Sequence, residues 1–308
     1  MFMGYSLGEI GSIFAMQAFA GLILFSVFVL MALGLAIIFG QMGVINMAHG
    51  EFMILGAYMT FLTSHLFQTY APQAFAGYFF VAMLVAFLVS GAIGLAVEWL
   101  LIKRLYKRPL DTLLATWGLS LIMQQAFRSI FGAREVGVQL PDWMMGSLQV
   151  TDTIEVQING LFVMTLTLII TAIVALLLFR SRWGLQVRAV VANRIMADAA
   201  GIDTRRIDRL TFGLGCGIAG IAGSAFTMIG STSPTAGQAY IVDTFLVVVF
   251  GGAQSLLGTI ASAFTISQSQ STLEFFLTGS MAKVTTLLIV IGLLMLRPQG
   301  LFVLKVRK

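Results

Sequence analysis

The chain has 308 residues, of which 58% are hydrophobic and only 10% are charged, and its mean hydropathy is +0.96. A soluble domain carries about 25% charged residues, so this composition leaves too little polar surface for a protein that lives in water. It excludes soluble enzymes and predicts an all-α polytopic integral membrane protein.

The net charge of +5 is distributed unevenly. No Lys or Arg precedes Lys103, and most of the later ones fall in three clusters, at residues 103–108, 180–209 and 297–308. Cytoplasmic loops carry an excess of Lys and Arg, so we place these clusters, the C-terminus included, in the cytoplasm. Arg128, Arg134 and Lys283 then lie at the other face. Because each cluster adjoins an apolar stretch, we interpret the clusters as topological signals and expect no nucleic-acid binding.

A spanning helix needs about 20 apolar residues, or fewer where the helix is broken. In the first part of the chain, apolar stretches that run alternately inward and outward are predicted at residues 13–39, 51–66, 75–102 and 111–131. A polar turn at residues 70–73 separates the second from the third on the outer side.

The longest polar connection, at residues 132–160, alternates apolar and polar residues and predicts an external loop with short β-strands. Further spans are predicted at residues 161–179, 210–230, 240–250, 259–277 and 283–296. The basic segment 180–209 forms a cytoplasmic loop between the first two of these. The total is about nine spans, with eight to ten as the range, in one transmembrane domain over residues 1–308.

Residues 40–51 interrupt an apolar stretch that extends from residue 10 to residue 67. Lipid offers no hydrogen bonds, so polar side chains and non-helical backbone at membrane depth must face protein or a water-filled path. The break predicts part of a substrate pathway. Its polar residues are Gln41, Asn46, His49 and Glu51, and its hinge glycines are Gly40, Gly43 and Gly50.

A second glycine break, with Gly251, Gly252 and Gly258, divides the spans at residues 240–250 and 259–277. Residues 249–254 resemble residues 38–43, since each joins Gly and Gln to an apolar helix that runs inward. Paired interrupted segments typically mark the central site of a transporter. The likeness is short, so a true internal repeat stays an open alternative.

Other polar residues lie inside predicted spans, among them Gln124, Gln268 and Gln270. Such side chains either bond neighbouring helices or line a path for a small polar solute. The residue types leave both roles open.

Residues 193–206 predict a short cytoplasmic helix that ends at Gly201, a natural left-handed cap, with Asp203 or Thr204 capping the next helix. Two alternatives remain, an ordinary basic loop or a rigid knob that docks into a partner protein. The candidate docking residues are Arg194, Asp198, Ala199, Ala200, Gly201 and Asp203.

No catalytic motif is visible. The sequence lacks a phosphate-binding G-x-x-x-x-G-K-[ST] loop, so any ATP that drives transport must be hydrolysed by another subunit. The two histidines are too few and too far apart for a metal cluster, and no cofactor is expected. His49 and Glu51 could form a proton relay, which keeps a solitary channel or proton-coupled carrier as an alternative.

Residues 34–58, with the sequence Asn-Met-Ala-His-Gly-Glu at positions 46–51, resemble the signature of the permease subunits of ABC importers for branched-chain amino acids and their relatives. The resemblance continues at residues 199–203, 251–259 and 296–302, in the family's order. Within the family, residues 39–52, 240–251 and 258–276 are most similar to permeases of urea importers. One departure is Gln254, where the family more often has glycine.

The resemblance implies a complex in the bacterial inner membrane. Its other members would be a second homologous permease, two ATP-binding subunits and a periplasmic substrate-binding protein. It implies alternating access driven by ATP, with docking of the ATPase at residues 198–201. Urea is the expected substrate, because the neutral amides of Gln41, Asn46, Gln268 and Gln270 suit it without a buried charge. Branched-chain amino acids are the alternative.

Overall fold

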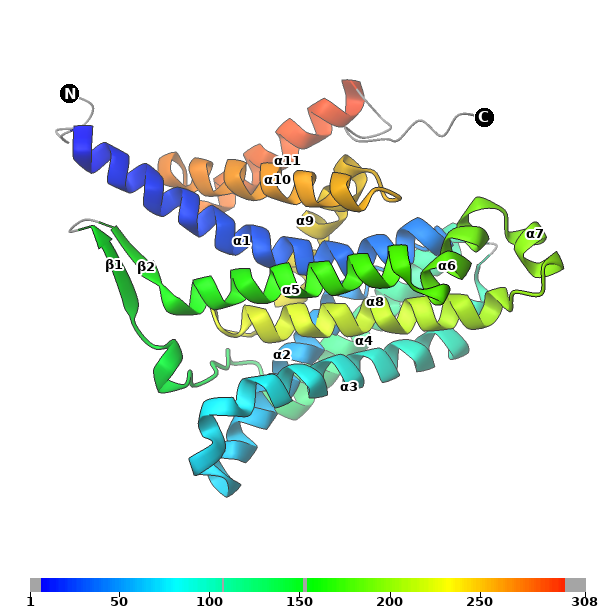
Figure 1. Ribbon diagram of the computed structural model, residues 1–308, viewed down its shortest axis with the longest axis horizontal. Coiled ribbons are helices and arrows are strands. Elements are labelled where there is room, and N and C mark those ends of the chain that lie inside the picture. The colour runs from blue at the N-terminus through cyan, green and yellow to red at the C-terminus, as the bar shows by residue number, and fades with distance from the viewer. Residues whose placement is uncertain (1–6, 107, 152–153, 297–308) are drawn as a thin grey trace.

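The computed structural model describes residues 7–106, 108–151 and 154–296 (Figure 1). Most of these residues are helical. The elements in chain order are α1 (Leu7–Met42), α2 (His49–Tyr70), η1 (Pro72–Gly77), α3 (Tyr78–Leu100), η2 (Ile102–Arg104), α4 (Pro109–Phe131), η3 (Asp142–Met144), β1 (Ser147–Thr151), β2 (Ile154–Gln157), α5 (Ile158–Arg180), α6 (Arg182–Ala192), α7 (Arg194–Ala199), α8 (Thr204–Phe226), α9 (Ala236–Gly251), α10 (Leu256–Phe276) and α11 (Gly279–Leu296).

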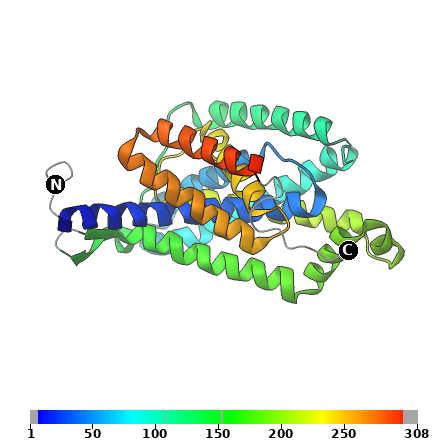
Figure 2. The ribbon, with the colours of Figure 1, turned by 90° about the horizontal axis from the view of Figure 1, so that it is seen from above.

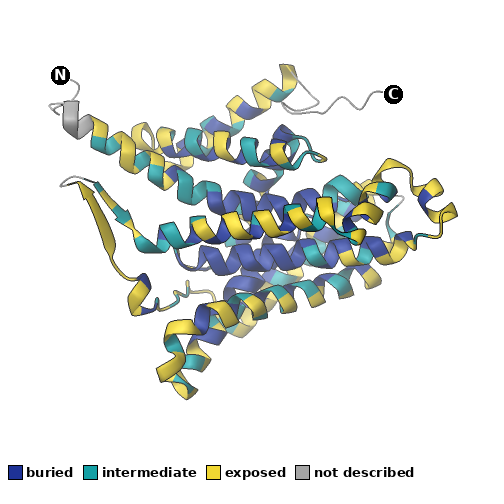
Figure 3. Cartoon of the chain, viewed as in Figure 1, coloured by how far each residue is buried: buried dark blue, intermediate teal, exposed yellow. Residues whose placement is uncertain are grey.

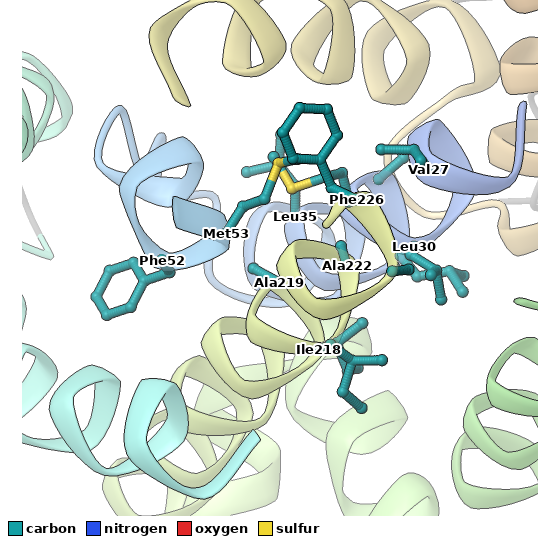
Figure 4. Packing of buried hydrophobic residues seen from close by; sticks show 14 of the residues in the cluster. Val27, Leu30, Leu35, Phe52, Met53, Ile218, Ala219, Ala222 and Phe226 are labelled. Carbon is teal, nitrogen blue, oxygen red and sulfur yellow. The ribbon is translucent and has the colours of Figure 1, made fainter. Parts of the chain in front are cut away.

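Helix α8 is the centre of the bundle, where it packs against α1, α2 and α3. Figure 3 shows the buried residues concentrated in α8, in α2 and in the second half of α1. In Figure 4, Phe226 of α8 and Met53 of α2 converge beside Leu35 of α1. The helices around this core expose apolar side chains, as expected where a helix faces lipid.

Small residues allow these helices to approach closely. A Cβ atom on Gly223 would lie 1.9 Å from the Met53 carbonyl oxygen of α2, and one on Gly56 would lie 2.1 Å from the Gly220 carbonyl oxygen of α8. Helix association in a membrane depends on this kind of packing, because lipid is as apolar as the side chains. Thr60 reinforces the α2–α8 contact by donating a hydrogen bond to Ser224 Oγ at 2.7 Å.

The predicted external loop contains the expected β-strands, and it is tied to the turn between α2 and α3. Strands β1 and β2 pair antiparallel. Trp143 Nε1 donates a hydrogen bond to the Ala76 carbonyl oxygen at 2.8 Å, and the Tyr78 hydroxyl donates to the Gln139 carbonyl oxygen at 3.0 Å. Figure 1 shows this hairpin and the α6–α7 segment at opposite ends of the molecule.

Two basic clusters that are separate in sequence meet at the α6–α7 end. Arg194 of α7 lies over the Tyr106 ring, with 5.7 Å between the guanidinium carbon and the ring centroid. Tyr106 and Arg194, which belong to the two clusters, are therefore neighbours, and the cytoplasmic placement of both clusters stays a prediction. Lys107 and the third cluster, with the family-like stretch 297–302, lie outside the described residues.

Within the described residues, five helices are long and apolar enough to cross a membrane. They are Gly11–Met42, Pro72–Arg104, Ile158–Arg180, Thr204–Phe226 and Gly279–Leu296, and Ala236–Gly251 is a shorter apolar helix. The chain is therefore a multi-pass membrane protein. The count of about nine spans stays a prediction.

The predicted break at residues 41–50 is shorter in the structure. Helix α1 continues to Met42 and ends where Gly43 takes a left-handed φ of +64°, and α2 already begins at His49. Only residues 43–48 are non-helical. The polar residues Gln41, His49 and Glu51 therefore lie in the terminal turns of the two helices, and their place on a substrate pathway stays a prediction.

The basic segment 180–209 is more ordered than the single short helix we predicted. It also contains α6, which Ser181 caps by accepting a hydrogen bond from the Gly184 amide, and the first turns of α8. Asp203 caps α8 by accepting a hydrogen bond from the Arg206 amide, so that helix starts at Thr204, in agreement with the cap predicted at Asp203 or Thr204.

The tightest helix contact gives a first prediction. We expect Gly223→Ala to destabilise the purified protein by about 1–3 kcal/mol, since the added methyl group meets backbone that cannot move aside. Gly118→Ala in α4 is the control, because its Cβ would meet nothing within 4 Å. Thermal unfolding in detergent measures both variants, and equal midpoints would contradict the packing argument.

Candidate functional site

Asn46 holds the break between α1 and α2 in a tight turn through two local hydrogen bonds. The Asn46 side-chain oxygen accepts a hydrogen bond from the Ala48 amide at 3.1 Å, and its carbonyl oxygen accepts one from the His49 amide at 3.2 Å. These bonds form a turn that leads into α2, whose N-cap residue is Ala48. Asn46 is fully buried, and its Nδ2 has no hydrogen-bond partner among the described residues.

His49 fixes the start of α2 against α1. Its Nε2 lies 3.1 Å from the Met31 carbonyl oxygen, and its ring is fully buried. A Cβ atom on Gly34 would come within 3.1 Å of the imidazole, so the ring requires a small residue in α1 at this level. The contact explains His49 as a positioning residue. It does not bond Glu51, so the described geometry gives the suggested proton relay no direct link.

Glu51 is the centre of a buried polar cluster between α2 and α4. One carboxylate oxygen, Oε1, accepts hydrogen bonds from Ser120 Oγ at 3.0 Å and from Gln124 Nε2 at 2.8 Å. The other oxygen, Oε2, has no partner among the described residues and faces Gly237 of α9, where an added Cβ atom would be 3.1 Å away. Gln124 is thus brought to Glu51 in the first turn of α2.

Helix α4 reaches the break with a polar stripe spaced at four residues, which is Thr112, Thr116, Ser120 and Gln124. Thr116 Oγ1 accepts a hydrogen bond from the Met47 amide at 3.2 Å. The opposite face of α4 is exposed and apolar, and Figure 2 shows the helix (teal) along the edge of the bundle. The hydroxyl residues of this stripe were missed from the sequence, although their i, i+4 spacing was the available signal.

The two glycine breaks that the sequence paired touch each other. A Cβ atom on Gly40 would lie 2.4 Å from the Ala253 carbonyl oxygen, and one on Gly251 would lie 2.4 Å from the Gly258 carbonyl oxygen. Gly252 has a left-handed φ of +87°. Gly50 packs against Gly237, where its Cβ would be 2.2 Å from the carbonyl oxygen. The end of α1 therefore packs on the α9–α10 hinge, and the start of α2 packs on the start of α9.

The other predicted pathway residues lie apart. Gln41 is at the end of α1 with both amide atoms buried and unbonded among the described residues. Gln268 donates a hydrogen bond to the Ala18 carbonyl oxygen at 3.2 Å, and Gln270 donates to Glu274 Oε1 at 3.2 Å. At 1.5 Å per residue, Ala18 is about 35 Å along α1 from the break. Gln268 thus belongs to the α1–α10 contact, Gln270 bonds within α10, and neither joins the cluster around Glu51.

The candidate docking segment has the predicted local structure. Asn193 caps α7 through the Met196 amide at 3.1 Å. Gly201 has φ +84°, and the Gly201 and Ile202 amides bond the Asp198 and Ala197 carbonyl oxygens, each at 3.0 Å. This pair of bonds is a Schellman motif. The helix therefore ends as the sequence predicted, with Ala199, Ala200 and Gly201 exposed.

Asp198 and Arg194 face the protein's own helices. Asp198 accepts a hydrogen bond from Thr204 Oγ1 at 2.8 Å, and Arg194 forms an ion pair with the fully buried Asp208 of α8. Next to them, the Tyr106 hydroxyl donates to Glu98 Oε1 at 2.6 Å, and Arg209 Nε lies 3.3 Å from Glu98 Oε2.

The pKa of the Tyr106 phenol is raised, mainly by burial and secondly by its hydrogen bond to Glu98. The phenol therefore stays protonated and donates that hydrogen bond. These contacts join α7 to α8 and α3 through buried carboxylates.

An apolar cavity of about 350 Å³ opens beside the break. It is lined by Met47, by Leu287 of α11, and by Ile241, Val242, Phe245, Leu246 and Val249 of α9. Close to it, Lys283 Nζ lies 2.9 Å from Asp243 Oδ2 and 5.4 Å from the centroid of the Tyr240 ring. From the sequence, Lys283 was placed at the outer face and its partner Asp243 was missed, because the two residues lie 40 positions apart.

The chain matches a protein-family model described as a permease component of branched-chain amino acid transport systems over residues 17–297. It belongs to this permease family. A probable branched-chain amino acid permease of Methanocaldococcus jannaschii, LivH, is 27% identical in an alignment of 300 positions. The alignment covers 91% of this chain and 90% of that protein.

Two bacterial relatives are also permease proteins of branched-chain amino acid transport systems. The Escherichia coli permease protein LivH of the high-affinity branched-chain amino acid system is 27% identical, over 94% of this chain and 95% of its own. The corresponding protein BraD of Pseudomonas aeruginosa is 24% identical, over 92% and 94%. No solved structure is significantly similar to the chain. These names favour branched-chain amino acids over the urea that we expected from single stretches of sequence.

The Glu51 cluster gives a second prediction. We expect Glu51→Ala to destabilise the protein by about 1–3 kcal/mol, because it leaves Ser120 and Gln124 with buried, unpaired donors. Glu51→Gln keeps an acceptor oxygen and should be milder. Glu155→Ala in the exposed strand β2 is the control. Thermal unfolding in detergent decides, and a Glu51→Ala protein as stable as the control would contradict the cluster's structural role.

Proposed function

We propose that the chain is the membrane-spanning subunit of an ABC importer for branched-chain amino acids. The match to the permease family over residues 17–297 carries this proposal, supported by relatives with that printed role that align over nine-tenths or more of their length. The apolar cavity beside the break, with its aliphatic and aromatic lining, suits an aliphatic side chain.

Urea is the second candidate, and one observation favours it. The buried break offers an unpaired donor, Asn46 Nδ2, and an unpaired acceptor, Glu51 Oε2. A small neutral amide satisfies both kinds of group at once without bringing a charge into the membrane. Asn46, His49, Glu51 and Gln124 remain the proposed pathway residues at the break. For Gln41, Gln268 and Gln270 we propose helix packing instead.

The third prediction concerns the substrate. Cells in which this chain is deleted and then restored should lose and regain uptake of labelled leucine at low concentration, with urea uptake unchanged in parallel. The control is the same plasmid without an insert. Loss and rescue of urea uptake alone would replace the proposed substrate while leaving the transporter class intact.

We further propose a complex in the bacterial inner membrane, with residues 1–308 as one permease domain, a second homologous permease, two ATP-binding subunits and a substrate-binding protein. Loop 132–160 would face outward and the α6–α7 end would face the cytoplasm. Closure of the ATPase dimer would push α7, whose ion pair to Asp208 passes the movement to α8. The glycine-packed breaks would then open the path alternately to each side.

A fourth prediction tests the docking role. Ala200 is exposed next to the left-handed Gly201, so Ala200→Arg should insert and fold normally but lower uptake at least about tenfold, because the added side chain blocks a partner socket. Ala74→Arg is the control, since Ala74 is also exposed but lies by the external loop. Uptake and ATP hydrolysis are measured in proteoliposomes that contain the whole complex.

Normal uptake by a well-expressed Ala200→Arg protein would contradict docking at α7. Reconstitution of this chain alone tests the remaining alternative, a solitary channel or proton-coupled carrier. Robust flux without any ATPase subunit would indicate a solitary channel or carrier and would overturn the importer proposal.

A further inference from the structure

An ion pair with a 37% exposed Lys283 side chain lies beside the apolar cavity, and the mechanism above does not use it. Asp243 lies in the middle of α9, and Lys283 lies near the start of α11, with 2.9 Å between Oδ2 and Nζ. The Asp243 side chain is only 14% exposed. Ionisable residues within membrane helices are costly and therefore point to a functional site by default.

The ion pair and the cavity share helix faces. Leu246 follows Asp243 by three residues on α9, and Leu287 follows Lys283 by four residues on α11, and both leucines line the cavity. Residues three or four apart on a helix are neighbours on its surface. The charged groups therefore stand about one helical turn, roughly 5 Å, from the apolar lining.

Aromatic side chains and the start of α2 border the ion pair on its other sides. The Tyr240 ring lies under the Lys283 ammonium, and it packs on Phe226 of α8 at 5.1 Å and on Phe28 of α1 at 6.4 Å between centroids. Gly237, one turn before Tyr240, faces the free carboxylate oxygen of Glu51. The region thus combines a cation, two carboxylates and an aliphatic cavity.

This set of groups matches a zwitterion with an aliphatic tail. An α-amino acid needs an anion for its ammonium, a cation for its carboxylate and an apolar space for its side chain, and a neutral amide needs neither charge. We propose that Asp243 and Lys283 bind the α-ammonium and α-carboxylate of an aliphatic amino acid whose side chain enters the cavity lined by Leu246 and Leu287. The inference rests on the proposed function and names the site at which that substrate would bind.

The competing interpretation is that the pair only ties α9 to α11. A charge swap separates the two roles, because Asp243→Lys with Lys283→Asp keeps the attraction between the helices and reverses both partners of the substrate. We expect Asp243→Asn and Lys283→Met to lower the initial rate of leucine uptake at least about tenfold each. The swapped protein should stay equally low, while Asp243→Glu and Lys283→Arg should retain more of the rate.

The assay uses the complete importer in cells that lack the chromosomal copy, with the amount of protein in the membrane measured by immunoblot. If the swapped protein regains uptake, the pair is structural and the inference is overturned. Wild-type rates in the Asp243→Asn and Lys283→Met proteins overturn it as well.

The cavity is tested by filling it. Leu246→Trp should lower uptake of leucine at least about threefold more than uptake of valine, because the larger side chain loses more of its space. Leu288→Trp is the matched control, since Leu288 is exposed on α11 next to Leu287. An equal loss for both substrates would show that lipid or the second permease packs the cavity, and it would overturn the assignment.

Failure of the inference differs from failure of the proposed function. If the wild-type protein restores urea uptake and no leucine uptake, the substrate proposal fails and this site fails with it. If the wild-type protein imports leucine and the variants behave like it, only the site assignment is wrong.

Discussion

The close approach of α8 to its neighbours is the constraint on which the rest of this protein depends. Apolar surface gains nothing by meeting another helix in lipid, so contact area and hydrogen bonds must hold the bundle together. Glycines at positions 56, 220 and 223 bring the α2 and α8 backbones together, and Thr60 adds a hydrogen bond between them. This fixed core gives the break at residues 43–48 a rigid wall on one side.

At the break, the buried polar side chains of Asn46, His49 and Glu51 each make a polar contact within the protein, while Asn46 Nδ2 and Glu51 Oε2 have no partner among the described residues. The Asn46 side chain accepts from the Ala48 amide just before α2, His49 lies against the Met31 carbonyl oxygen, and Glu51 accepts from Ser120 and Gln124 of α4. The polar stripe is what α4 presents to the bundle, since its other face is apolar and exposed. A helix held by a few polar contacts can move relative to the core at little cost, which suits a transport cycle of alternating access.

The opposite end of the molecule shows how a force on α7 would be transmitted. Arg194 bonds Asp208 within α8, and Glu98 of α3 accepts from both Tyr106 and Arg209. Buried carboxylates that lose a partner are costly, so these pairs hold the segments together as one body. Under the proposed coupling, movement of α7 would carry α8 with it, and α8 contacts α2 just beyond the break.

The sequence by itself determined the membrane class, the permease family, the two glycine breaks and the end of α7 at Gly201. These features depend on local rules, namely composition, a left-handed glycine at 201 and a cap at Asp203. The same rules could not show that Gln268 bonds Ala18, which is about 35 Å along α1 from the break. They also could not show that Ser120 of α4 bonds Glu51, or that Asp243 pairs with Lys283. Those pairings join residues tens to hundreds of positions apart. Only the tertiary packing of helices decides them, because one polar residue in an apolar span carries no record of which neighbour it faces.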